Sequence, residues 1–247
     1  MDSKVTHPQR FRAFYPLYQW TIYLPVCMLA TVIGALFAVP IGYFISPRWA
    51  NLHIAVWWAK LLTRLCGARV VVTGAENVQP GQSYVVVANH QSAFDIPVIY
   101  GYSGLDLRWV MKAEIKWIPF VAAGCRAIGH VFVERGNTQQ ATQAINQAVS
   151  RLTPGTGVLF FPEGTRSLDG ALLPFKKGAF RLAQDQNMPV LPVTVKHTRD
   201  VLPPKKWTIA PRPVELEFHP PILPKQGDEH LNELMVKARS AIEQGLL

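Results

Sequence analysis

Two residues that could exchange a proton with a substrate, His90 and Asp95, follow a short apolar run over residues 84–88. Such a run is typical of a buried strand. If Ser92 caps a helix over 92–102, Asp95 lies in its first turn and folds back toward His90. A carboxylate on one imidazole nitrogen fixes the tautomer and leaves the other nitrogen free to accept a proton. The pair is therefore a candidate general base, although a turn histidine beside a helix-capping aspartate gives the same pattern.

A second polar cluster follows the strand expected over 157–161. In it, Gly164 lets the backbone turn tightly and Thr165 offers a hydroxyl. Arg166 presents a planar fork of donors, which binds phosphate or carboxylate groups bidentately. Glu163 either binds the substrate directly or holds Arg166 or the turn in place. The cluster therefore indicates an anion-binding site.

A second cation for such a site could come from Arg135, which closes the run 129–135, although an isolated arginine at a strand end is more often solvated. The three cysteines lie far apart in no metal-binding or redox spacing, and their odd number favours reduced, buried thiols. No H-E-x-x-H motif or clustered Cys/His set is present. We therefore expect no metal and no cofactor.

Short β-branched runs alternate with helical stretches after residue 68. The strands are expected over 69–73, 84–88, 107–111, 127–134, 157–161, 190–196 and 214–219, and the helices over 92–102, 138–152, 175–186 and 228–244. This alternation predicts an α/β fold with a mainly parallel central sheet covered by helices. Function in such sheets sits beyond the carboxyl ends of the strands, which is where both polar clusters occur.

The N-terminal region contains 35 consecutive uncharged residues, from 13 to 47. A helix needs about 20 apolar residues to cross a bilayer core, so this segment is long enough to enter one. A full span would export Lys4, Arg10 and Arg12, which the positive-inside rule disfavours. A helix that dips into one leaflet keeps both ends on the cytoplasmic side. Both arrangements stay open, but the segment is expected to contact lipid.

A second helix is expected over 49–67, with Trp57 and cationic residues beside a broad apolar surface. We interpret it as an interfacial helix, and the alternative is packing on the protein's own core. The composition changes near residue 67, which predicts membrane-docking helices over 1–67 and an α/β domain over 68–247. The basic loop 196–207 is either a second membrane contact or a solvated loop.

The overall composition also favours a lipid-contacting protein. The chain has 247 residues and a net charge of +9, with 49% apolar and only 17% charged residues. A disordered chain would be far more polar. The positive balance and the low charge density together favour a partner that is both apolar and anionic. Nucleic acid satisfies only the second condition, whereas a phospholipid surface satisfies both. We therefore expect a membrane surface as partner and no nucleic acid.

The polar clusters resemble conserved blocks of the glycerolipid acyltransferase family. Four segments match in family order: the His90-x4-Asp95 box, Gly129 to Arg135, Phe161 to Ser167, and Pro189 to Thr194. Together they cover roughly residues 70 to 200. The chain is most similar to the bacterial 1-acylglycerol-3-phosphate acyltransferases, also in its size and in its apolar N-terminal helical pair. Lys112 resembles a lysine that the family carries between its first two blocks.

The resemblance implies transfer of an acyl group from coenzyme A or acyl carrier protein to the sn-2 hydroxyl of lysophosphatidic acid. It implies that His90 is the general base, that Asp95 orients it, and that the enzyme works at the cytoplasmic side of the cell inner membrane. The residues that it assigns to the substrate are Lys112, Arg135, Glu163, Gly164, Thr165 and Arg166. Donors for the oxyanion are either backbone N–H groups or Lys112.

Three other functions fit parts of the pattern. A lipase could use His90 and Asp95 with water, but no G-x-S-x-G nucleophile motif is present. A non-enzymatic lipid-binding protein is disfavoured because both residues of the box are intact. An acyltransferase for another lysolipid, such as lyso-ornithine lipid, would share the fold and the His–Asp chemistry, and it remains the main alternative.

Overall fold

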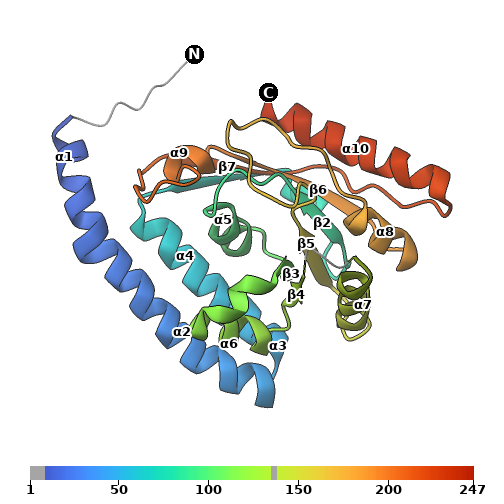
Figure 1. The fold of residues 1–247 in the computed structure, drawn as a ribbon, viewed down its shortest axis with the longest axis horizontal. Coiled ribbons are helices and arrows are strands. Elements are labelled where there is room, and N and C mark those ends of the chain that lie inside the picture. The colour runs from blue at the N-terminus through green and yellow to red at the C-terminus, as the bar shows by residue number, and fades with distance from the viewer. Residues whose placement is uncertain (1–8, 135–137) are drawn as a thin grey trace.

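The computed structural model of the chain describes residues 9–134 and 138–247. Its centre is a seven-stranded sheet in the order β1-β7-β6-β2-β5-β3-β4 (Figure 1). The strands are β1 (Arg69–Thr73), β2 (Val85–Ala88), β3 (Asp106–Lys112), β4 (Val131–Val133), β5 (Thr156–Phe160), β6 (Val190–Lys196) and β7 (Pro213–Phe218). The five strands from β6 to β4 are mutually parallel, and β7 is antiparallel to β6 but parallel to β1. The mainly parallel sheet is thus confirmed.

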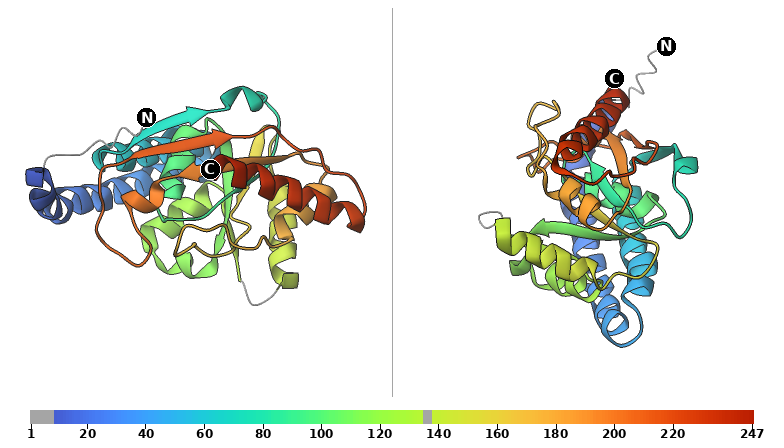
Figure 2. Two further views of the ribbon diagram at one scale, coloured as in Figure 1. Left: turned by 90° about the horizontal axis from the view of Figure 1, so that it is seen from above. Right: turned by 90° about the vertical axis from the view of Figure 1, so that its right-hand side faces the viewer.

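Helices cover the sheet on both faces (Figures 1 and 2). The helical segments are α1 (Gln9–Tyr18), η1 (Gln19–Tyr23), α2 (Leu24–Phe44), α3 (Pro47–Trp49), η2 (Ala50–Ala55), α4 (Val56–Leu65), η3 (Ala75–Asn77), α5 (Asp95–Tyr102), η4 (Ala113–Trp117), α6 (Pro119–Ala127), α7 (Thr138–Val149), α8 (Gly178–Asp185), α9 (Thr198–Val201) and α10 (Asp228–Leu246). In Figure 1, α2 and α4 lie at the lower left and α8 and α10 at the right.

The continuous apolar run at β2 is explained by burial on both faces of the sheet. Val86 and Ala88 belong to the core that also contains residues of α4 and α5. Val85 and Val87 belong to the second core, under α8 and α10. All four side chains are fully buried. Because alternate residues of a strand point to opposite faces, a strand between two helical layers is apolar at every position.

Several predicted boundaries differ from the structure. The strand expected over 127–134 is only Val131–Val133, because the helix α6 occupies the preceding segment and Gly129 turns with a φ of +84°. The sequence pattern did not predict α6. The helix expected from residue 175 begins at Gly178, and the helix expected from Ser92 begins at Asp95. Strand β6 has the predicted bounds.

The N-terminal segments form an antiparallel helical pair beside the sheet (Figure 1). The first arm is α1, η1 and α2, which continue into one another, and the returning arm is α3, η2 and α4. At the open end of the pair, the hydroxyls of Tyr15 and Tyr18 donate to the carbonyls of Cys66 and Leu65, at 2.6 and 2.9 Å. The two arms are thus tied together where the chain enters β1.

Small residues bring α2 close to the α/β domain. Its buried residues are Ala30, Gly34, Ala35, Ala38 and Gly42. A methyl group in place of a Gly42 hydrogen would lie 2.5 Å from the carbonyl oxygen of Ala127 in α6, so only glycine permits this contact. The first arm therefore packs along its length on the domain.

The outer side of the first arm is apolar and open. Met28, Leu36 and Phe37 are 70%, 62% and 59% exposed, and Phe44 is 87% exposed. Within the described part of the chain, one helix, Phe14–Phe44, is long and apolar enough to cross a membrane, and only 28% of its most apolar stretch is buried. An exposed apolar face of this kind is not part of the protein core and suggests membrane association.

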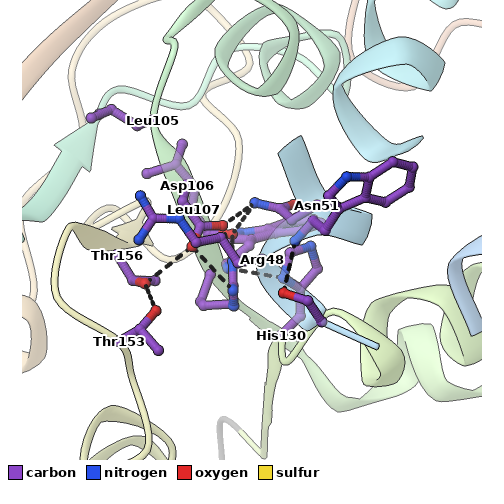
Figure 3. A network of polar contacts seen from close by, with 12 residues as sticks. Arg48, Asn51, Leu105, Asp106, Leu107, His130, Thr153 and Thr156 are labelled. Carbon is purple, nitrogen blue, oxygen red and sulfur yellow. Dashed lines mark hydrogen bonds and ion pairs between the residues drawn. The ribbon is translucent and has the colours of Figure 1, made fainter. Parts of the chain in front are cut away.

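The closed end of the pair is anchored to the sheet by a buried polar network (Figure 3). Asn51 donates from Nδ2 to Asp106 Oδ1 at 2.8 Å, and Arg108 pairs with the same carboxylate at 2.5 Å. Thr156 donates to Asp106 Oδ2 at 3.1 Å. Arg48 donates to the carbonyl of Pro154 at 3.0 Å. These bonds join the predicted helical region to the α/β domain, while the division near residue 67 stays a prediction.

The interpretation of 49–67 as an interfacial helix needs correction. The helix α4 packs against α5, and its Ala59 and Thr63 are fully buried. Trp58 packs against the core and donates from Nε1 to Thr31 at 3.0 Å. Only Trp57, at 48% exposure, and its neighbours on one narrow face remain open. The apolar surface of this helix therefore belongs mostly to the protein core, as in the alternative interpretation.

Candidate active site

Strand order brings the predicted site residues to one edge of the sheet. Strands β2, β5, β3 and β4 are consecutive neighbours and parallel, so their carboxyl ends lie side by side. His90 follows β2, the turn 163–166 follows β5, and Lys112 is the last residue of β3. Arg135, predicted to supply a second cation, lies outside the described residues. The candidate site is the loop surface beyond these strand ends.

The contact predicted between His90 and Asp95 is confirmed. The Nδ1 of His90 lies 2.7 Å from Asp95 Oδ2, and Asp95 is the first residue of α5. Asp95 is fully buried, whereas the side chain of His90 is 13% exposed. The carboxylate holds the tautomer in which Nδ1 carries the proton, so that Nε2 is left as the acceptor.

Ser92 does not cap a helix at residue 92. Its backbone N–H donates to Asp95 Oδ2 at 2.9 Å, and that of Gln91 does so at 2.8 Å. The Ser92 hydroxyl instead accepts from Phe94 N and donates to the carbonyl of Leu202. The turn is thus held by two side chains, because the Ser92 hydroxyl accepts from an N–H that follows it and the Asp95 carboxylate accepts from the N–H groups that precede it.

Asp95 has a further partner that the sequence did not reveal. The hydroxyl of Thr198, in α9, donates to Asp95 Oδ1. Thr198 is fully buried. The predicted basic loop 196–207 is therefore not only a surface loop, because its first part folds under the site. The two residues are 103 positions apart, and no local pattern marks the contact.

The cluster after β5 packs directly on the histidine. The ring of Phe161 stacks on that of His90, with centroids 4.0 Å apart and planes at 19°. Ser167 N donates to the His90 carbonyl at 2.9 Å. The two sequence clusters thus form one unit, in which the backbone and the ring of His90 are both held.

Glu163 joins the loop after β2 to the segment before α8. Its Oε1 accepts from His90 N at 2.6 Å and its Oε2 from Leu173 N at 2.9 Å. The side chain is buried, and burial raises its pKa above the ordinary value while the two N–H donors act in the opposite direction. These contacts match the turn-holding role considered from the sequence. No ion pair between Glu163 and Arg166 occurs among the described residues.

The predicted anion-binding residues are open to solvent. Gly164 turns with a φ of +73°, a conformation that favours glycine. Thr165, Arg166 and Lys112 are exposed. In the part of the chain that the structure describes, none of these three side chains forms a hydrogen bond or an ion pair. Among the described residues, two exposed cations without an ion-pair partner therefore lie at the ends of β3 and β5.

An apolar cavity lies beside the site, between α2, the returning arm, α5 and α6. Trp58, Ile96, Trp109 and Phe120 are among its lining residues. Trp109 meets Phe161 edge-on, with centroids 6.3 Å apart, so the cavity wall reaches the residue that stacks on His90. Such a cavity suits a hydrocarbon chain whose reactive end lies at the histidine.

This arrangement can move a proton next to a bound anion. His90 Nε2 can accept a proton, the buried carboxylate can stabilise the imidazolium that forms, and exposed cations lie at the neighbouring strand ends. Among the described residues, no group of three or more His, Cys, Asp or Glu side chains could hold a metal ion.

Comparisons with known proteins agree in fold and sequence. The family described as "Acyltransferase" matches residues 69–196. The human 1-acyl-sn-glycerol-3-phosphate acyltransferase alpha is 31% identical over 194 residues, which are 78% of this chain and 68% of the human protein. The Saccharomyces cerevisiae 1-acyl-sn-glycerol-3-phosphate acyltransferase is 34% identical over 161 residues, or 62% of this chain and 53% of the yeast protein.

A solved structure extends the similarity to the helical pair. The crystal structure of the 1-acyl-sn-glycerophosphate (LPA) acyltransferase PlsC from Thermotoga maritima superposes with a TM-score of 0.80. The two chains are 29% identical, and the match covers 95% of each. A match of that extent includes the N-terminal helices as well as the sheet.

Proposed function

The chain belongs to the acyltransferase family and is an O-acyltransferase, and we propose that it acylates the sn-2 hydroxyl of 1-acylglycerol-3-phosphate to form phosphatidic acid. The donor in this proposal is an acyl thioester, on coenzyme A or on acyl carrier protein. The observation that carries the proposal is the buried Asp95 behind His90, at the same sheet edge as the exposed Arg166. The names of the human and yeast relatives support the choice of acceptor.

His90 would act as general base and then as general acid. Its Nε2 takes the proton of the acceptor hydroxyl as the oxygen attacks the thioester carbonyl carbon. The tetrahedral intermediate collapses, the C–S bond breaks, and the imidazolium returns the proton to the thiolate. Asp95 stabilises the imidazolium between these steps. The oxyanion is held by backbone N–H groups or by Lys112. No step draws on a metal or on a cofactor other than the donor.

The phosphate of the acceptor would position the reacting hydroxyl as well as add to the binding affinity of the acceptor. Arg166 can bind it bidentately, and the Ser167 N–H bond to the His90 carbonyl fixes this turn relative to the base. A phosphate held there keeps the reacting hydroxyl near Nε2, which lowers the entropic cost of reaching the transition state. The apolar cavity beside Trp109 would hold a fatty acyl chain at the same time.

For the membrane, we propose that the helical pair lies in one leaflet and keeps the site on the cytoplasmic side of the inner membrane. The first arm is held at both ends, because Gln19 bonds to Ile209 N at 2.9 Å and Gly42 packs on Ala127. A full span would carry these parts of the domain into the bilayer. Trp117 and Phe120, 86% and 46% exposed near the same arm, suit the interface.

The test is an assay with purified protein, a labelled acyl donor and a set of lysolipids. We expect label to move to lysophosphatidic acid, with His90→Ala as the inactive control. Transfer to lyso-ornithine lipid instead would reassign the acceptor, and release of free fatty acid without transfer would make the protein a thioesterase or lipase. Parallel reactions with acyl-CoA and acyl carrier protein donors identify the thioester.

A further inference from the structure

One lysine outside the four family-like blocks lies against the predicted phosphate turn. Lys176 donates from its backbone N to the carbonyl of Pro162 at 2.8 Å, which aligns the segment before α8 with the start of the turn. A methyl group in place of the Gly164 hydrogen would lie 2.8 Å from Lys176 Nζ and 2.9 Å from its Cε. The end of the lysine side chain therefore crosses the turn at the glycine, immediately before Thr165 and Arg166.

The absence of a side chain at Gly164 thus has two effects. It allows the φ of +73°, and it leaves room for the ammonium group of Lys176. The adjacent Lys177 precedes the first residue of α8, and the three atoms nearest to the added methyl group all belong to Lys176. Of the two consecutive lysines, Lys176 is therefore the one whose side chain lies at the turn.

Within residues 9–134 and 138–247, no acidic group forms an ion pair with this charge. None of the ion pairs among the described residues includes Lys176, Arg166 or Lys112. The carboxylate nearest in sequence to Lys176, Asp169, accepts from the Ser167 hydroxyl and from Ala171 N, each at 3.0 Å. The buried Glu163 accepts two backbone N–H bonds. Lys176 lies against the turn that carries Arg166, and two like charges at one turn repel each other, so the pair fits an anionic ligand better than it fits solvent.

We propose that Lys176 is a second cation for the acceptor phosphate, placed across Gly164 from the backbone that carries Arg166. This inference rests on the proposed function and adds to it a residue that positions the substrate. Arg166 supplies planar, bidentate geometry, whereas Lys176 supplies a point charge that can follow the phosphate. Two cations of different geometry would hold a phosphate dianion and discriminate against a neutral head group.

The experiment compares Lys176→Gln with the matched control Lys177→Gln. Steady-state kinetics are measured separately for lysophosphatidic acid and for the acyl donor. 1-Acylglycerol, which has the chain but lacks the phosphate, is tested as a competing ligand. For Lys176→Gln we expect KM for lysophosphatidic acid to rise roughly tenfold. The donor KM and the inhibition constant of 1-acylglycerol should stay within twofold. Lys177→Gln should change none of these constants, and Lys176→Arg should recover most of the acceptor affinity.

Two outcomes would overturn the assignment: an acceptor KM for Lys176→Gln within twofold of wild type, or equal losses toward lysophosphatidic acid and 1-acylglycerol. Either result would make Lys176 a surface lysine or a structural one. A failure of the proposed function is seen separately, because the wild-type protein would then not acylate lysophosphatidic acid at all. Circular dichroism of each variant shows that the fold is retained.

Discussion

Thr198 donates a hydrogen bond to the carboxylate oxygen of Asp95 that His90 does not use. Both oxygens of this buried carboxylate are therefore engaged, since Oδ2 also accepts from Gln91 N and Ser92 N. A carboxylate held by several donors keeps one orientation. We infer that Thr198 positions Asp95, and through it the imidazole, without touching the substrate.

Thr198→Val tests this relationship. The substitution keeps the shape and removes the donor, so Asp95 Oδ1 is left unsatisfied in a buried site. We expect kcat to fall roughly tenfold, a smaller loss than for Asp95→Asn, while KM for the acceptor stays within twofold, because Thr198 orients the catalytic pair and does not touch the substrate. Thr198→Ser should restore kcat. A loss of stability with kcat unchanged at matched folding would leave Thr198 a structural residue.

His90→Ala should abolish nearly all turnover. Loss of a general base costs at least about 10²-fold in rate. Glu163 cannot easily replace it, because both of its carboxylate oxygens accept backbone N–H bonds. His197→Asn is the matched control, because His197 also lies near an aspartate, 3.4 Å from Asp200, but at the exposed surface. Turnover by His90→Ala above a tenth of the wild-type rate would contradict the assignment.

Arg166→Lys should weaken binding of the acceptor lysolipid but not binding of the acyl donor. Lysine keeps the charge but loses the planar fork, so we expect kcat/KM for lysophosphatidic acid to fall roughly ten- to a hundredfold. Binding of the acyl donor, measured by calorimetry, should barely change. Arg181→Lys, in a half-exposed pair with Asp228, controls for the substitution itself. The converse result, with lower donor affinity and unchanged acceptor kinetics, would assign Arg166 to the acyl carrier.

Acidification should destabilise the protein through His130. Burial, assisted by the Arg108 cation, lowers its pKa from 6.5 to about 3. Below pH 6.5 the imidazole therefore binds a proton in the unfolded state but not in the folded state. The contribution of His130 to the free energy of unfolding is constant above that pH and falls as the pH drops toward 3. The slope from this group reaches about 1.4 kcal/mol per pH unit.

The measurement is denaturant unfolding in detergent at pH 7, 6 and 5, for the wild type and for His130→Asn. We expect a smaller loss of unfolding free energy on acidification in the variant, and comparison of the two proteins cancels the contribution of His219, whose pKa burial also lowers. Parallel pH curves for the two proteins would show that His130 is not the titrating group.

The predicted contact of the first helical arm with lipid is best tested by point substitutions and not by deleting the arm. Removing residues 1–66 would expose the core that Ala59 and Cys66 help to close. We instead expect the combined change of Met28, Leu36 and Phe37 to glutamine to lower sedimentation with anionic vesicles roughly tenfold or more, because three large apolar side chains no longer enter lipid. Leu223→Gln, at a 75% exposed position outside the pair, should bind normally. Unchanged binding by the triple variant would place the docking surface elsewhere.

The sequence alone determined the features that depend on near neighbours. Apolar and β-branched runs located the seven strands of the described residues. In β2 and β5 the run is continuous because burial between two helical layers favours an apolar residue at every position. The contact of His90 with Asp95 follows from their spacing at the start of α5. Gly164 was identified as a turn residue because few other residues adopt its φ. Each of these features is encoded within a few residues of chain.

Only the tertiary structure decided which distant segments meet. Strand order set β5 beside β2 and so brought Ser167 onto the backbone of His90. Thr198 reached Asp95, and Lys176 crossed Gly164, through packing that leaves no periodic or compositional trace in the sequence. The sequence could not decide whether α4 packs against α5 for the same reason. The residue pattern of an amphipathic helix is the same whether its apolar face contacts lipid or the protein core, so the contact is known only once the neighbouring element is known.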